Sequence, residues 1–181
     1  QRSQMSQLTG WWNGVTTGDF DGDGRMDIAA SNWGRNTRTE MFRAEPLRLF
    51  HGEASGDGSV QAIEGYSDPA SKRLLPMQAF HVMGAAVPAM RERMGSFENY
   101  AKSTLPEIYG DAWKSLRELN AATLDSMIFL NRGDHFEARS LPIEAQLAPA
   151  FAVCAGDLDG DGMEDLFLSQ NFFSAQPDIP R

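Results

Sequence analysis

The feature that most constrains the fold is a ten-residue stretch, GDFDGDGRMD at residues 18–27, which nearly repeats as GDLDGDGMED at residues 156–165. The two copies agree at seven of ten positions, and in both the aspartates alternate with other residues through a Gly-Asp-Gly centre. A third stretch, GEASGDGSVQ at 52–61, keeps the glycines but loses most of the carboxylates. Repetition of one short loop predicts a fold built from repeated units.

Short apolar and β-branched runs flank the two strong copies. NGVTT and DIAAS surround the first, and FAVCA and LFL surround the second. Such runs on both sides of a glycine-rich turn are typical of paired antiparallel strands. FAVCA and LFL are apolar on both faces, which predicts strands packed between neighbouring sheets. The only cysteine, Cys154, lies in FAVCA and is therefore expected to be a buried structural thiol.

Two further segments differ from these loops. DSMIFLNRGDHFEARSLP predicts another hairpin, with its turn around residues 131–135. Residues 76–124 are rich in Ala, Met, Leu and charged residues, and this composition predicts a helical insertion. Ser96 is the expected N-cap of one helix, while Pro88, Pro106 and Gly110 divide the segment into short helices.

The alternating carboxylates predict a binding site for a hard cation. Side chains at loop positions 1, 3 and 5 converge only if the chain curls tightly, and the glycines permit the positive φ that this needs. Position 7 supplies a backbone carbonyl, and the aspartate at position 9 closes the ligand set. All ligands are oxygens, which favours calcium over zinc or copper, and the flexible geometry favours calcium over magnesium. The predicted ligands are Asp19, Asp21, Asp23, Arg25 (carbonyl) and Asp27 in the first loop, and Asp157, Asp159, Asp161, Met163 (carbonyl) and Asp165 in the second.

A polar turn without a metal is the alternative, since Asp and Gly both favour turns. A turn needs only one or two aspartates, and four unneutralised carboxylates would repel one another. The loop at 53–61 fits the alternative better. There Glu53, Ser55 and Gln61 replace aspartates and only Asp57 matches, so this loop is expected to bind calcium weakly or not at all.

These loops resemble the FG-GAP/VCBS repeat family, whose calcium loops follow Asp-x-Asp-x-Asp-Gly-x-x-Asp and whose best-known members are integrin α-subunit propellers. GWWNGVTTGDFDGDGRMDIAASNWGRNTR, FLNRGDHFEARSLPIEAQLAP and GDLDGDGMEDLFLSQNFF together look most similar to secreted VCBS-repeat proteins of the ASPIC/UnbV type. The Gly-Ala-Pro of FG-GAP is missing, because AASNW and LSQNF stand in its place.

The resemblance implies a mainly β fold, a partial β-propeller with an α-helical insertion between blades. Its expected parts are blades with two loops at 1–75, the insertion at 76–124 and blade strands at 125–181. Propellers need at least four blades, so the chain is expected to be a fragment of a larger propeller with blade edges exposed for association. By the same resemblance, calcium is structural and the protein is extracellular, secreted or in the cell envelope.

Charge and hydropathy exclude two classes of partner. The net charge is −9, whereas nucleic-acid binding needs a basic face. No apolar run is long enough to span a membrane. A protein or carbohydrate ligand remains possible, with Trp11, Trp12 and Trp33 as either a sugar-stacking platform or, in the favoured interpretation, core packing. Arg132-Gly133-Asp134 forms an RGD tripeptide, but its place in the predicted hairpin favours a turn over an integrin ligand.

The sequence predicts a binding or adhesion module and no enzyme activity. It contains no nucleophile elbow, P-loop or dinucleotide fingerprint. The alternative is a catalytic or non-catalytic part of a carbohydrate-active propeller enzyme whose active site lies outside these residues. Nothing in the spacing of the remaining acids and imidazoles assembles a catalytic group; these are Glu92, Glu98, Glu107, His51, His81 and His135.

Overall fold

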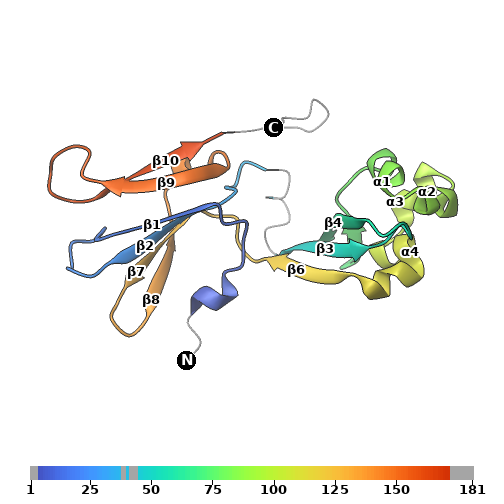
Figure 1. Cartoon of the computed structure of the whole chain (residues 1–181), viewed down its shortest axis with the longest axis horizontal. Helices are drawn as coiled ribbons and strands as arrows, with labels where there is room; N and C mark the ends of the chain where they lie inside the picture. The colour runs from blue at the N-terminus through green and yellow to red at the C-terminus, as the bar shows by residue number, and fades with distance from the viewer. Residues whose placement is uncertain (1–3, 38–39, 41–44, 172–181) are drawn as a thin grey trace. The chain divides into compact units, whose positions relative to one another are not determined.

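The computed structural model describes residues 4–37, 40 and 45–171, and its elements are drawn in Figure 1. As predicted, the fold is mainly β, with ten strands in antiparallel sheets and few, short helices among the described residues. The chain forms two compact units. The first contains the described residues up to 41 and from 122, and the second contains those from 42 to 121.

The first unit contains a four-stranded antiparallel sheet in the order β1-β2-β7-β8. Its strands are β1 (Gly14–Gly18), β2 (Asp27–Ser31), β7 (Met127–Asn131) and β8 (Phe136–Ser140). Within this sheet each strand pairs with the next one in sequence order, as in a propeller blade. The second unit is inserted in the sequence between β2 and β7. The predicted hairpin around residues 131–135 is confirmed as the β7–β8 turn.

A second, two-stranded sheet of the same unit consists of β9 (Ala150–Gly156) and β10 (Asp165–Gln170). Its strand β9 packs on β1. At this contact a Cβ atom at Gly14 would lie 3.4 Å from the Cα atom of Ala152, so the two backbones are close neighbours.

The prediction that the β9–β10 strands are covered on both faces is wrong for the described residues. Cys154 is exposed, and so is its cross-strand partner Phe167. Val153 and Leu168, which pair on the other face of the hairpin, are half-buried. The described residues cover only one face, so the apolar pattern on the other face, including the thiol, lies open to solvent.

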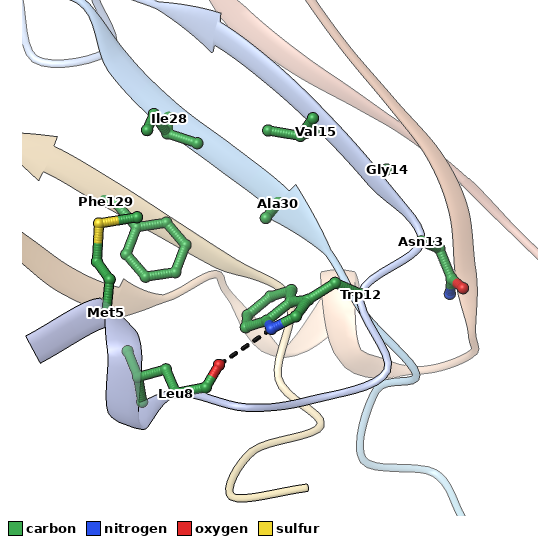
Figure 2. A pocket seen from close by; sticks show the side chains of 9 residues that line it. All are labelled: Met5, Leu8, Trp12, Asn13, Gly14, Val15, Ile28, Ala30 and Phe129. Carbon is green, nitrogen blue, oxygen red and sulfur yellow. Dashed lines mark hydrogen bonds between the residues drawn. The ribbon is translucent and has the colours of Figure 1, made fainter.

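The N-terminal segment packs on the other face of the first sheet. Met5, from the 3-10 helix η1 (Gln4–Gln7), contacts the cluster formed by Ala30, Met127 and Phe129 together with Leu8 and Trp12. The indole N–H of Trp12 donates to the carbonyl of Leu8 (3.0 Å). An open apolar groove of about 440 Å³ remains beside this segment (Figure 2), lined by Met5, Leu8, Trp12, Asn13, Gly14, Val15, Ile28, Ala30 and Phe129.

A buried polar network joins the points where the chain leaves β2 and returns to β7. The backbone N–H of Asn32 donates to the hydroxyl of Ser126 (3.1 Å). The side chain of Gln146, in η4 (Ile143–Gln146), accepts from the Ser126 N–H (2.8 Å) and donates to the Ser126 carbonyl (2.9 Å). Arg35 forms a bidentate ion pair with Asp125. These bonds hold the ends of β2 and β7 together, although 95 residues separate the two strands in the sequence.

The second unit is a four-stranded antiparallel sheet with short helices. Its strand order is β5-β4-β3-β6, with β3 (Leu47–Glu53), β4 (Val60–Ser67), β5 (Leu74–Pro76) and β6 (Arg117–Ala121). The helices are α1 (Phe80–Ala86), α2 (Pro88–Met94), α3 (Phe97–Lys102), α4 (Leu105–Tyr109) and the 3-10 helix η3 (Gly110–Ser115). All five helices fall inside the segment 76–124, where the sequence predicts helices.

Local signals set the helix ends in this unit. Ser96 is the N-cap of α3, as predicted, and its side chain accepts from the N–H of Asn99 (3.2 Å). Pro88 begins α2, where a missing N–H costs nothing. The unit's core joins sheet and helices through Phe50, Ile63, Met83, Val87, Met90, Met94, Tyr100, Leu105, Ile108 and Tyr109. Two of these ten residues, Phe50 in β3 and Ile63 in β4, come from the sheet, so the compact unit includes strands that precede the helices.

Candidate metal centre

The first acidic loop, residues 19–26, is the turn that joins β1 to β2, whose last pair is Gly18 with Asp27. Asp27 is fully buried, and its two carboxylate oxygens accept backbone N–H bonds from Phe20 (3.1 Å) and Asn131 (2.7 Å). This carboxylate therefore ties the loop to the neighbouring strand β7.

The backbone of the same loop curls around Asp19. Its carboxylate accepts from the N–H groups of Asp23 (3.0 Å) and Gly24 (2.8 Å). Gly22 and Gly24 have φ of 71° and 84°, a region that residues with a Cβ rarely adopt. The glycines thus provide the predicted curl.

This curl brings Asp19, Asp21 and Asp27 together, with one oxygen from each lying within 4.8 Å of the others. Asp23 is not part of this group; its carboxylate accepts from the N–H of Arg25 (2.9 Å) and pairs with the Arg25 guanidinium. The structure therefore gathers three of the four predicted aspartates of this loop.

The second acidic loop, residues 157–164, joins β9 to β10 and repeats the same scheme. The carboxylate of Asp157 accepts from Gly160 (2.8 Å) and Gly162 (3.1 Å), and that of Asp165 accepts from Leu158 (3.0 Å). Asp157, Asp159 and Asp165 place one oxygen each within 4.8 Å of one another. Asp161 again lies outside the group and accepts from the N–H of Met163 (2.8 Å).

The degenerate loop between β3 and β4 keeps the turn but changes its interior. Gln61 takes the place of Asp27 and accepts from the Ala54 N–H (2.7 Å). Its amide nitrogen donates to Ser55 (2.8 Å), so a donor points inward where the other loops present acceptors. Asp57 accepts from the hydroxyls of Ser55 and Ser59. Hydrogen bonds among the loop's own groups occupy its interior, and weak or absent calcium binding stays a prediction for this loop.

Arg132, from the β7–β8 hairpin, reaches the first acidic loop. Its guanidinium lies 2.6 Å from the carboxylate of Asp21, 3.5 Å from that of Asp23 and 2.9 Å from that of Glu137. This contact holds the pKa of Asp21 below its ordinary value, chiefly through the hydrogen bond. The arginine of the RGD tripeptide is thus engaged by its own unit, which favours the turn interpretation.

Glu164, like Arg132, contacts the first acidic loop although the sequence does not predict this contact. It belongs to the β9–β10 loop, yet its carboxylate accepts from the backbone N–H of Asp19 in the other acidic loop (2.6 Å). The separation in sequence is 145 residues, and no pattern within either loop indicates the contact.

The donor chemistry of the two acidic loops fits calcium. Each loop offers clustered carboxylate oxygens on a turn held by glycines and backbone hydrogen bonds, and hard oxygens in adaptable geometry are what Ca²⁺ takes. Among the described residues, neither group contains a His or a Cys, the ligands that zinc and copper prefer.

The tryptophans do not form a flat stacking platform. Trp11 and Trp33 meet edge to face, with ring centroids 5.5 Å apart, and Trp33 meets Phe151 in the same way at 6.1 Å. Trp12 packs edge-on against Phe129 at 6.0 Å. These contacts favour the core-packing interpretation.

Comparison with known proteins gives one match. Residues 11–37 match the model of the FG-GAP repeat. That segment contains β1, the first acidic loop and β2, so the match falls on the residues that carry the FG-GAP resemblance. No curated protein and no solved structure matches the chain. The match gives no support to a closer relation with ASPIC/UnbV proteins.

Proposed function

We propose that this chain is a calcium-binding β-propeller repeat module in which calcium has a structural role. The observation that supports this best is the shared hydrogen-bond scheme of the two acidic loops, which converges three carboxylates in each. The ion would be held by Asp19, Asp21 and Asp27 in one loop and by Asp157, Asp159 and Asp165 in the other, joined by Asp23 and Asp161 and by the carbonyls of Arg25 and Met163.

Bound calcium supplies positive charge that offsets the repulsion among the carboxylates. The protein contributes the rest: glycines that allow the curl, backbone N–H groups that orient Asp19 and Asp157, and strands that anchor Asp27 and Asp165. Each occupied loop fixes the connection between two strands of a sheet. Affinities typical of extracellular calcium modules, about 10⁻⁴–10⁻³ M, are expected.

The module's role is proposed to be extracellular binding or adhesion, with a protein or carbohydrate ligand, and no catalysis. FG-GAP repeats are typical of extracellular proteins, and the matched segment supports this location. Among the described residues, no helix is long and apolar enough to cross a bilayer.

Two of the acids outside the loops have partners within their own helices. Glu107 forms the capping box of α4 with Thr104, and Glu98 pairs with Lys102 along α3. These contacts favour the binding module over the alternative, a part of a carbohydrate-active propeller enzyme.

Calorimetric calcium titration tests the proposal. The wild-type chain is expected to bind two ions, and Asp21→Ala and Asp159→Ala are expected to remove one each. Asp57→Ala, in the degenerate loop, is the matched control and should leave two. Undiminished binding in both loop variants would refute the proposal.

A further inference from the structure

The two acidic loops lie against each other at one end of the first unit, where the turn after β1 and the turn after β9 are on the same side (Figure 1). The packing of β9 on β1 sets this arrangement. A side chain at Gly18 would overlap the carboxylate of Glu164, and one at Gly22 would lie 3.2 Å from the terminal carbon of Met163. Residues of the β9–β10 loop therefore contact the β1–β2 loop at Gly18, Asp19 and Gly22.

Within this contact, Glu164 makes a bond that bears directly on the other loop's ligands. Its carboxylate accepts the N–H of Asp19 (2.6 Å), and the Asp19 carboxylate is one of the three gathered in the first site. A charge-assisted bond to a backbone amide is among the stronger hydrogen bonds. It fixes the backbone from which the Asp19 side chain projects.

The position of Glu164 is set by its own loop. It lies between Met163 and Asp165, and Asp165 is held both by pairing with Gly156 and by its bond from the Leu158 N–H. Glu164 thus reaches Asp19 from the last position of the β9–β10 loop, directly before β10. It orients a ligand of the other loop, β1–β2.

We propose that Glu164, a residue of the β9–β10 loop, is a positioning residue for the calcium site of the neighbouring β1–β2 loop in the same chain. This inference rests on the proposed function and deepens it. It assigns to Glu164 a role at the neighbouring site and none as a ligand at its own. The first site is then complete only when the second hairpin is packed beside it.

The contact also gives the two loops different dependences. The carboxylates of Asp19 and Asp157 both accept from their own loops, but among the described residues only the N–H of Asp19 donates to a side chain of the other loop, and no side chain of the β1–β2 loop accepts the N–H of Asp157 in return. Removal of Glu164 is therefore expected to weaken the first site and spare the second.

The test is a calcium titration of the full chain followed by ¹H–¹⁵N NMR, because each loop is then observed separately. The amides of Gly22 and Gly24 report the first loop, and those of Gly160 and Gly162 report the second. Glu164→Ala is expected to raise the half-saturating calcium concentration of the first loop about five- to tenfold, the scale of a lost hydrogen bond to a charged group at an exposed site. The second loop is expected to shift less than about twofold.

Glu164→Gln keeps an acceptor without the charge and is expected to restore the first loop to within about threefold of wild type. Glu144→Ala removes one exposed carboxylate from the same unit outside both loops and is the control for net charge. Equal weakening of both loops, no change at the first loop, or a Gln variant as weak as the Ala variant would overturn the inference. A wild-type titration that moves neither set of glycine amides would instead refute the proposed function on which it rests.

Discussion

The guanidinium of Arg132 donates to the carboxylate of Asp21 across 2.6 Å, although the two residues are 111 positions apart in the sequence. The bond links the β7–β8 hairpin to the β1–β2 loop of the same sheet. It places a fixed positive charge beside carboxylates that are proposed to bind a cation.

Replacing Arg132 with Ala is therefore expected to tighten calcium binding at the first loop, by about three- to tenfold at low salt, because the guanidinium competes for Asp21 and repels the ion. Calorimetry at two ionic strengths measures this, and the gain should shrink at high salt. Arg139→Ala is the matched control, since Arg139 pairs with Glu137 but, unlike Arg132, not with Asp21 or Asp23. Weaker binding in Arg132→Ala would show that the arginine supports the site.

The degenerate loop allows a test by gain of function. Glu53→Asp, Ser55→Asp and Gln61→Asp together restore the alternating carboxylates on a turn whose glycines, Gly56 and Gly58, already have φ near 80°. The triple variant is expected to bind three calcium ions where the wild-type chain binds two.

Gln61→Asp alone is the control for the triple variant, because it restores one carboxylate only. A stoichiometry that stays at two in the triple variant would mean that glycines and carboxylates are not sufficient for a site.

Asp27 is expected to stabilise the fold even without calcium. It is fully buried and accepts two backbone N–H bonds, so Asp27→Ala leaves two part-buried donors without this acceptor, at a cost of about 2 kcal/mol. Denaturant unfolding in the presence of a chelator measures the change. Asp165→Ala, at the corresponding position of the second loop, should cost less because Asp165 is only half-buried and accepts one such bond from Leu158. Equal costs would contradict this account.

In the degenerate loop, the carboxyl of Asp57 is expected to have a pKa below its ordinary value. Hydrogen bonds from the hydroxyls of Ser55 and Ser59 and from the Ser59 N–H lower the pKa of Asp57 to about 2. Because the folded pKa lies below that of an unfolded aspartate, about 3.9, the stabilisation is present above pH 4 and is lost as the pH falls toward 2.

NMR titration of the Asp57 carboxyl measures this pKa directly. Ser59→Ala should raise it, whereas Ser115→Ala, which changes a serine outside the loop, should leave it in place. A pKa for Asp57 near 4 in the wild-type chain would contradict the hydrogen-bond network.

Local sequence patterns predicted the strands beside the two acidic loops, the β7–β8 hairpin and the convergence of most of the candidate carboxylates. Strand β6 lies inside 76–124, where the sequence predicted helices. The glycines at 22, 24, 160 and 162 have positive φ, and short apolar or β-branched runs flank them, so both hairpins follow from short segments. The carboxylates converge for the same local reason. Asp23 and Asp161 lie outside the two groups, and each accepts from an N–H two residues further along its loop; composition does not determine which carboxylates lie outside.

Long-range contacts account for what the sequence did not predict. Arg132 and Glu164 reach the first loop only because β7 pairs with β2 and β9 packs on β1. Cys154 was expected to be buried because its strand is apolar on both faces, but burial depends on what covers each face. Among the described residues, one face of that hairpin has no cover over Cys154 and Phe167.

The central claim is that two loops bind calcium and the third does not. A crystal structure of the chain grown with millimolar calcium, with anomalous differences recorded at long wavelength, tests this most directly. The account predicts two anomalous peaks, one among Asp19, Asp21 and Asp27 and one among Asp157, Asp159 and Asp165, and none in the loop at 53–61. Absence of both peaks, or a peak in the degenerate loop with none in the acidic loops, would contradict it.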